Sequence, residues 1–215
     1  MTSQRHSTCE RSVRRSAGRV SDAVLLHAAR ESVLANGVRR STLTDIARRA
    51  DVSRMTLYRR FPDMRSVVTT LMGEEFAGIL RKARAAEGRG TARQRLVAVT
   101  LEAVRSLRSD PLLLRVLDTD AEMLLPYLVQ RLGSTQLAAE RFVREYLHEG
   151  HADGSIRHGD PDTQTRVLVL TAQSFVLSSR PASTDVSPED LVDELARHLD
   201  AALRPAGFPD AEEDR

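Results

Sequence analysis

The side chains best suited to a chemical role lie in one short segment, residues 53–60, with the sequence Ser-Arg-Met-Thr-Leu-Tyr-Arg-Arg. Guanidinium groups form bidentate hydrogen bonds with phosphate and with the edge of guanine, and hydroxyl groups also bond to phosphate. A short helix with such groups on its outer face is typical of a helix laid in the DNA major groove. We therefore expect a DNA-reading face made of Ser53, Arg54, Met55, Thr56, Tyr58, Arg59 and Arg60, supported by Thr42, Thr44 and Arg65 nearby.

Two helices joined by a tight turn must position this face. Thr42 is placed to cap a first helix that runs to about Ala50, with Asp45 as its reciprocal partner three residues later. At 100° per residue this helix has one apolar side, which predicts that it packs against a core. Asp51 and Val52 then supply the turn between the helices.

The second helix of the motif runs from Arg54 to about Phe61. Ser53 is placed as its N-cap, and Pro62 ends it, because the residue before a proline is pushed out of the helical conformation. Leu57 and Phe61 lie one turn apart and point inward, which leaves the polar residues outside. The alternative interpretation is an ordinary helical hairpin with a solvated basic face.

A longer pattern surrounds this motif. It comprises Ala28 and Ala29, then Gly37, then Ser41 and Thr42 before Asp45-Ile46-Ala47, and then Val-Ser-x-x-Thr-Leu-Tyr-x-x-Phe over residues 52–61. With this pattern, residues 24–67 closely resemble the DNA-binding domain of the TetR family of bacterial transcriptional regulators. The resemblance implies that the second helix reads an operator, and that Tyr58 and the start of the next helix hold phosphates.

Two positions depart from the family pattern. Asp51 stands in the turn where the family usually has Gly, although Asp tolerates a left-handed conformation better than most residues. Met64 stands where the family usually has a Lys that grips phosphate. That contact is therefore either made by the neighbouring Arg65 or lost.

The charge of the chain is unevenly distributed. Residues 1–70 carry 14 Arg and six acidic residues, a net charge of +8, whereas residues 71–215 carry 18 basic and 24 acidic residues, a net charge of −6. A basic front half and an acidic rear half favour a polyanion-binding module joined to a module with a different task.

The composition is that of a protein with a core. The hydrophobic content is 41%, which is enough for one or two folded domains. No apolar run approaches the roughly 20 residues of a membrane span, and the N-terminus lacks the apolar stretch of a secretory signal. We therefore expect a cytoplasmic protein without a membrane partner.

The remaining segments are predicted to be helical. A helix over 19–36, with Leu25, Ala29 and Val33 facing inward and Gly37 as its stop, should brace the motif. A long helix from Met64 to about Ala86 links front and rear, and the TetR resemblance implies that it transmits movement between them. The rear helices are predicted at 91–109, 111–118, 121–132, 135–148, 161–179 and 188–204, and Pro126 predicts a kink or a later start in the third.

Two rear helices are candidates for a subunit interface. Residues 166–177 are apolar nearly all round, and leucines repeat at three and four residues in 188–204. Such a helix pair is expected to meet its two-fold copy, which would place two reading helices about 34 Å apart on a palindrome. The candidate interface residues are Val167, Leu170, Ser174, Leu191, Leu195 and Leu199; the alternative is that both helices pack into the core of the monomer.

One other cluster could carry chemistry. Residues 148–158 hold three His with Glu149 and Asp153, but their spacing fits no tight metal motif and Gly150 separates the first two His. A polar loop is the favoured interpretation, and His148 is placed to complement the end of a helix dipole. We expect neither a metal nor a cofactor.

The effector site is less sharply marked. The TetR resemblance implies that the rear helices enclose an inducer, and the candidate wall residues are Phe76, Val104, Leu107, Met123, Tyr127, Phe142 and Phe175. Each could instead be an ordinary core residue. The 4% aromatic content and the scarcity of polar groups on apolar faces favour an apolar or amphipathic effector.

Together these observations predict an all-α protein with a disordered arm (1–18), a helix-turn-helix domain (19–66), a helical ligand-binding and dimerisation domain (67–204) and a loose acidic tail (205–215). The predicted function is that of a ligand-responsive repressor that binds double-stranded DNA at a palindromic operator as a homodimer. Two alternatives are an architectural or partner-recruiting DNA-binding protein without an inducer, and a metal-dependent enzyme that uses the cluster at 148–158. We expect a protein that is not an enzyme.

Overall fold

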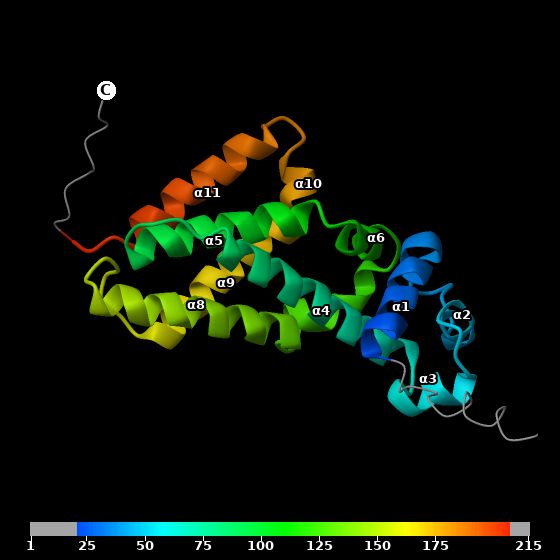
Figure 1. The fold of residues 1–215 in the computed structure, drawn as a ribbon. Coiled ribbons are helices and arrows are strands. Elements are labelled where there is room, and N and C mark those ends of the chain that lie inside the picture. Colours follow the sequence, from blue (N-terminus) through cyan, green and yellow to red (C-terminus); the bar gives the residue numbers. More distant parts are fainter. Residues whose placement is uncertain (1–20, 207–215) are drawn as a thin grey trace, which may run out of the picture. The chain divides into compact units, whose positions relative to one another are not determined.

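The computed structural model describes residues 21–206, and each regular element in that range is a helix (Figure 1), which confirms the all-α fold class. Residues 1–20 and 207–215 lie outside the described residues, and with them lie the predicted arm and most of the predicted tail. The described chain divides into two compact units between Val68 and Thr69, two residues after the predicted boundary.

The first unit contains α1 (Asp22–Asn36), α2 (Leu43–Arg49), α3 (Arg54–Arg60) and the start of α4 (Met64–Ala85). As predicted, Leu25, Ala29 and Val33 form an inward stripe on α1, and each is at most 2% exposed. Gly37 ends α1 with a φ of 78°, a conformation that favours glycine. α2 packs against both α1 and α3, so α1 supports the motif from behind.

A buried pair of hydroxyl groups fixes the turn between α1 and α2. The Ser32 hydroxyl donates to the Ser41 hydroxyl at 3.0 Å, and Ser41 donates to the Gly37 carbonyl at 2.8 Å. Both serines are at most 4% exposed. Because buried polar groups are costly without partners, these bonds hold the chain that enters α2 in one position.

The second unit contains the remainder of α4, followed by a helical bundle. Its elements are α5 (Ala92–Arg108), α6 (Pro111–Thr119), the 3₁₀ turn η1 (Ala121–Met123), α7 (Leu125–Val129), α8 (Ser134–Ala152), α9 (Pro161–Leu177), α10 (Ser179–Ala182) and α11 (Pro188–Leu203). α5 packs against α8, α9 and α11, and α8 packs along α9. The core of this unit therefore surrounds α5, where Leu96 and Val99 are each 1% exposed.

The region around Pro126 resolves an alternative that the sequence leaves open. The segment predicted at 121–132 is a 3₁₀ turn followed by α7, which begins at Leu125 and has Pro126 in its first turn. Proline is tolerated at this position because the first amides of a helix have no intrahelical partner. The later start is thus correct, and the helix ends at Val129 rather than at Leu132.

α8 is longer than predicted, and the interpretation of 148–158 as a loop is partly wrong. The helix continues through His148, Gly150 and His151 to Ala152. Gly150 does not break it. Instead, Ile156 folds back onto this glycine, and a Cβ added at position 150 would lie 2.3 Å from the Ile156 Cδ1 atom. The absence of a side chain at position 150 leaves space for Ile156 to pack, and it does not mark a turn.

None of the helices described over 21–206 combines the length and the apolar character that a membrane span requires.

Candidate nucleic-acid interface and effector domain

α2 starts with the predicted cap. The Thr42 hydroxyl oxygen accepts a hydrogen bond from the Asp45 backbone amide at 3.1 Å, and the Thr42 hydroxyl donates to the Asp45 carboxylate at 2.7 Å. Ile46 and Ala47 are at most 1% exposed, so the inner side of α2 is core. Thr44 is half-buried, and the Thr42 side chain is exposed but engaged with Asp45.

The turn between α2 and α3 contains the one non-glycine residue with a positive φ in the described range. Asp51 has a φ of 52°, in the left-handed region where the family pattern has glycine. The chain then reverses, and the Val52 amide donates to the Ala47 carbonyl at 2.9 Å. Asp51 therefore fulfils the geometric role of the glycine at some conformational cost.

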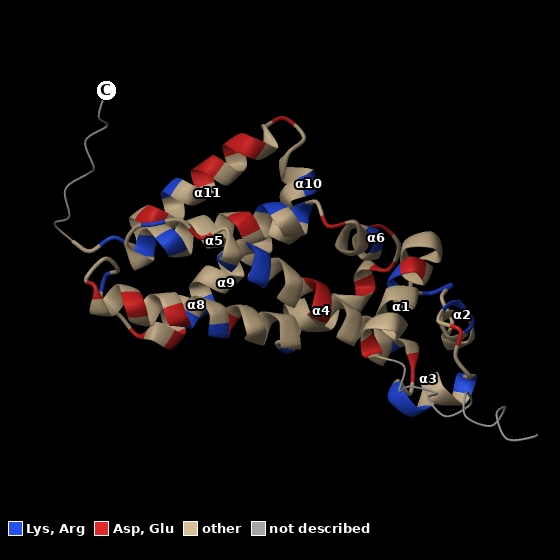
Figure 2. Ribbon diagram, viewed as in Figure 1, with Lys and Arg blue, Asp and Glu red and all other residues tan. Residues whose placement is uncertain are grey.

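α3 presents the predicted face. The Ser53 hydroxyl oxygen accepts from the Thr56 amide at 3.1 Å and caps the helix. Leu57 is fully buried and Phe61 is 5% exposed, whereas Met55 and Tyr58 are 76% and 48% exposed. Basic residues lie at both ends of the helix (Figure 2). The sequence period therefore gives the correct inner and outer sides of α3.

The arginines of this face differ in their availability. Arg54 and Arg59 are exposed and have no hydrogen-bond or ion-pair partner within residues 21–206. Arg60 instead pairs with Asp22 at the start of α1, a contact that sequence reasoning missed. At the start of α4, Met64 is half-buried and Arg65 is exposed, so Arg65 is the side chain placed to reach outward there.

The candidate interface residues on α11 need a correction. Leu195 and Leu199 are at most 2% exposed and belong to the hydrophobic core of their own subunit, so no partner chain can contact them. Leu191 is half-buried. The leucine stripe of α11 thus packs inward, as in the alternative that the sequence leaves open.

α9 retains an outward apolar surface. Val167 and Leu170 are 57% and 50% exposed, and Ser174 on the same helix is also exposed. Leu137 on α8 is 42% exposed and was missed by sequence reasoning. Ion pairs and hydrogen bonds hold α8 beside α9, among them the bond from Gln136 Nε2 to Gln173 Oε1 at 2.6 Å.

The candidate effector residues are divided between the core and its margin. Val104 is 2% exposed within the main core cluster, and Leu107, Phe142 and Phe175 are partly buried against that cluster. Phe76 on α4, Met123 in η1 and Tyr127 on α7 are half-buried. The Tyr127 ring lies against Gly133, where an added Cβ would come within 2.9 Å of the Tyr127 Cδ1 atom.

The histidines of 148–158 do not converge on one point. His148 is exposed on α8, and the ring nitrogen Nε2 of His151 is 2.9 Å from the Gln164 side-chain oxygen. The His151 and His158 ring centroids are 5.6 Å apart. In the part of the chain that the structure describes, no group of three or more His, Cys, Asp or Glu residues is arranged to hold a metal ion.

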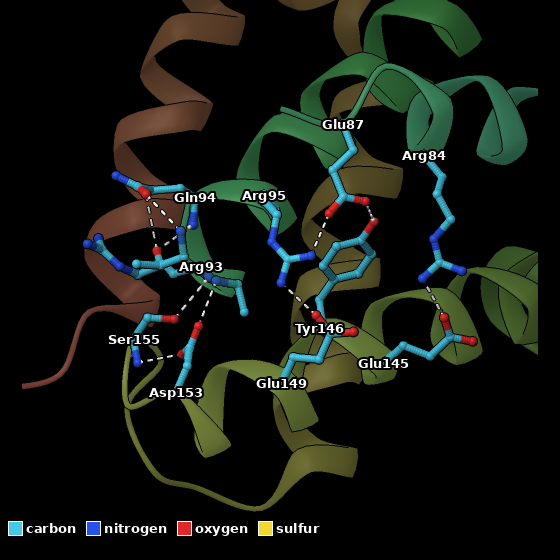
Figure 3. Close-up of polar contacts among 12 residues, drawn as sticks. Arg84, Glu87, Arg93, Gln94, Arg95, Glu145, Tyr146, Glu149, Asp153 and Ser155 are labelled. Atoms are coloured by element: carbon cyan, nitrogen blue, oxygen red, sulfur yellow. Dashed lines mark hydrogen bonds and ion pairs between the residues drawn. The ribbon is translucent and has the colours of Figure 1, made fainter. Parts of the chain in front are cut away.

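A polar cluster joins the C-terminal end of α4 to α5 and α8 (Figure 3). The Tyr146 hydroxyl donates to one oxygen of Glu87, and Arg95 donates to the other oxygen of Glu87 and to Glu149, each over 2.6 Å. The Arg84 guanidinium lies 5.4 Å from the centroid of the Tyr146 ring and also pairs with Glu145. These contacts fix the end of α4 to the bundle of the second unit.

The contacts of this cluster shift the pKa values of Glu87 and Tyr146. The hydrogen bond from Tyr146 and the contact with Arg95 hold the pKa of Glu87 below its usual value. Burial and the same hydrogen bond raise the pKa of Tyr146. The cluster is therefore most stable with Glu87 ionised and Tyr146 neutral.

The loop after α8 caps α5. The Ala92 amide donates to the Asp153 carboxylate at 2.9 Å, and the Arg93 amide donates to the Ser155 hydroxyl oxygen at 3.1 Å (Figure 3). Burial alone would raise the pKa of Asp153, but the hydrogen bonds from Ser155 and Ala92 outweigh it and lower that pKa. Asp153, which sequence reasoning placed in a possible metal cluster, is a helix cap.

The comparisons with known proteins agree with this geometry. Residues 25–70 match the family model described as bacterial regulatory proteins, tetR family. An HTH-type transcriptional regulator of Mycobacterium tuberculosis is 33% identical over 179 residues, which cover 83% of this chain and 92% of that protein. A regulator of Mycobacterium bovis matches with the same identity and coverage.

Solved structures share the fold at lower identity. The transcriptional regulator FadR from Bacillus subtilis, in complex with stearoyl-CoA, has a TM-score of 0.63 at 18% identity and covers 86% of this chain and 100% of its own. RolR, in complex with resorcinol, has a TM-score of 0.63 at 17% identity and covers 84% of this chain and 86% of its own.

Proposed function

Because the chain belongs to the TetR family of bacterial regulatory proteins and is a DNA-binding transcriptional regulator, we propose that it acts as a repressor. It binds a palindromic operator as a homodimer and releases the operator when a small apolar or amphipathic effector binds. The observation that carries this proposal is the outer face of α3, where exposed Arg54, Tyr58 and Arg59 stand on a helix held by buried Leu57.

The outer face of α3 supports the binding of a duplex. Arg54 and Arg59 have no protein partner within residues 21–206, so their guanidinium groups can bond to guanine or phosphate without first breaking an ion pair. Ser53 and Thr56 shape the start of the helix, and Thr42, Thr44 and Arg65 lie on the elements that flank it. Phosphate contacts from these flanking residues would fix the register.

The exposed apolar strip of α9 supports a dimer. Val167 and Leu170 each leave half or more of their surface in solvent within one subunit, and burying them against a second copy would be favourable. A two-fold copy presents two α3 helices to successive major grooves, which is the arrangement that a palindrome requires.

The composition of the second unit supports an apolar or amphipathic effector. Its partly buried aromatic side chains, Phe142 and Phe175, border an aliphatic core, and pockets for small molecules are lined mainly by such groups. Structural neighbours have been solved with stearoyl-CoA and with resorcinol, so these two compounds are the first probes to test.

The experiment is a gel-shift titration on the region upstream of the gene for this protein. Wild-type protein and Arg59→Ala are compared at one moderate salt concentration, because phosphate contacts make affinity strongly salt-dependent. Arg197→Ala, which removes an exposed arginine of α11 in the acidic unit, is the matched control.

Wild-type protein and Arg197→Ala should bind a discrete site within this region more tightly than random duplex. Arg59→Ala should lose about 1–3 kcal/mol of that preference, and added effector should release the wild-type complex. If wild-type protein and Arg59→Ala bound random DNA and the upstream region equally well, α3 would not be a sequence reader.

A further inference from the structure

Met55 is the most exposed large hydrophobic side chain in the described part of the chain, with 76% of its surface in solvent. Single exposed apolar residues are common on protein surfaces and need no special explanation by themselves. The position of Met55 distinguishes it, because it is the second residue of α3 and lies on the face that carries Arg59 one turn later.

The first turn of a recognition helix is the part that reaches the edges of the bases. In α3 the hydroxyl groups of this turn are engaged with each other: the Ser53 oxygen lies 2.9 Å from the Thr56 hydroxyl and also accepts from the Thr56 amide. Thr56 is also half-buried. The side chains that remain free to project from this turn are Arg54 and Met55.

A thioether has no hydrogen-bond donor, is only a weak acceptor and cannot pair with phosphate, so Met55 needs an apolar partner. The cationic side chains of Arg54 and Arg59 beside it make the approach of a nucleic acid favourable and that of an apolar protein surface costly. On the base edges of the major groove, the apolar group is the C5-methyl of thymine.

We propose that Met55 is a specificity-determining residue that reads a thymine in each half-site by packing its side chain against the C5-methyl group. This inference rests on the proposed DNA binding by α3 and goes beyond it, because it assigns a base and a chemical group to one side chain. Arg54 and Arg59 then supply the polar contacts on either side.

The expected loss of affinity follows from the apolar area that the thymine methyl group buries. Burial of one methyl group contributes about 0.8 kcal/mol, which corresponds to about a fourfold change in affinity. Removal of one such methyl from both half-sites should therefore weaken binding about fifteenfold, if the two sites contribute independently.

The test uses full-length protein and the operator recovered by selection from random-sequence duplexes. Each thymine of the half-site is replaced in turn by deoxyuridine, which removes only the C5-methyl and keeps base pairing. Affinities are measured by fluorescence anisotropy at constant salt for wild-type protein, Met55→Ala and Met55→Leu. Val24→Ala, which shortens a 47% exposed apolar residue of α1, is the control.

Wild-type protein, Met55→Leu and Val24→Ala should each lose affinity at one symmetry-related thymine position. Met55→Ala should bind thymine and deoxyuridine equally at that position while still preferring the operator to random DNA. The proposal is overturned if wild-type protein tolerates deoxyuridine everywhere, or if Met55→Ala discriminates as wild-type protein does. A protein that selects no sequence at all would instead contradict the proposed function.

Discussion

At the scale of single residues, Arg60 differs from its neighbours on the proposed DNA-reading face because it is paired with Asp22. Both side chains are about half exposed, at 58% and 46%, so the pair contributes little to stability. Its consequence is electrostatic, since a guanidinium that faces a carboxylate must exchange that partner before it can neutralise a phosphate. We therefore expect Asp22 to limit the contribution of Arg60 to non-specific DNA binding.

Asp22→Asn is therefore expected to tighten binding to random duplex and to steepen the dependence of log K on log salt by about 0.9, the equivalent of one additional phosphate contact. Fluorescence anisotropy over a salt series measures both. Glu31→Gln removes a negative charge from the same helix, away from Arg60, and should change the slope much less. If Asp22→Asn increased the affinity for random duplex and the salt slope equally in an Arg60→Ala background, the role of the pair would be refuted.

Gly150 offers a second prediction at this scale. A Cβ at this position would collide with Ile156, which is 1% exposed and has little room to move. Gly150→Ala should therefore destabilise the protein by about 1–3 kcal/mol, even though alanine favours a helix. Gly73→Ala, in α4 with nothing within 4 Å, should be neutral or stabilising by up to about 1 kcal/mol. Chemical denaturation compares the two variants, and equal effects would contradict this packing argument.

At the scale of elements, the end of α4 depends on an ionised carboxylate. A carboxyl group with a depressed folded pKa stabilises the fold at pH values above its usual pKa of 4.5, and this stabilisation is lost as the pH falls through the folded pKa. Glu87 is in this position because Tyr146 and Arg95 both donate to it.

Glu87→Gln should therefore lower the Tm at pH 7 and reduce the loss of Tm between neutral and acidic pH. Tyr146→Phe should cost about 2 kcal/mol, because it removes a hydrogen bond to a charged group. Thermal unfolding from pH 7 to 3 measures both effects. Glu194→Gln, which removes an exposed pair on α11, is the control. A Glu87→Gln profile parallel to that of wild-type protein would rule out this source of pH dependence.

Elements governed by local chemistry could be predicted from the sequence. The caps at Thr42 and Ser53 act over three residues, and Pro62 acts on its immediate neighbour, so α2 and α3 have nearly the predicted bounds. The contact between Asp22 and Arg60 spans 38 residues and left no signal in the sequence. The sequence predicts a break at Gly150, whereas the helix continues there and the glycine gives space to Ile156 through tertiary packing that no local pattern indicates.

The helices of the second unit illustrate a different limit on what can be predicted from the sequence. The leucine stripe of α11 is consistent with a core or with an interface, and the buried Leu195 and Leu199 show that it serves the core. The sequence does contain a signal that favours the core, because the leucines occupy only one side of α11 and its other side carries charged residues at 193, 194 and 197. α9 lacks such a polar side over 167–170, and its Val167 and Leu170 are indeed exposed.

At the scale of the whole molecule, dimerisation through α9 is the assumption that gives the operator its two-fold symmetry. Leu170→Asp would place a charge in a buried apolar interface, so it should shift the protein to monomer at micromolar concentration and weaken operator binding at least tenfold. Sedimentation velocity measures the assembly state. Val129→Asp, which introduces the same charge at a 73% exposed apolar position of α7, should leave it unchanged. A Leu170→Asp protein that remained dimeric would exclude this surface as the interface.

We propose that α3 reads a specific DNA sequence in two symmetric copies. Hydroxyl-radical footprinting of wild-type protein on its upstream region tests this most directly. The expected result is two protected half-sites with related sequences, centred about one helical turn, or 34 Å, apart, and lost with Arg59→Ala. Uniform protection of the fragment, or the same footprint with Arg59→Ala, would contradict the claim.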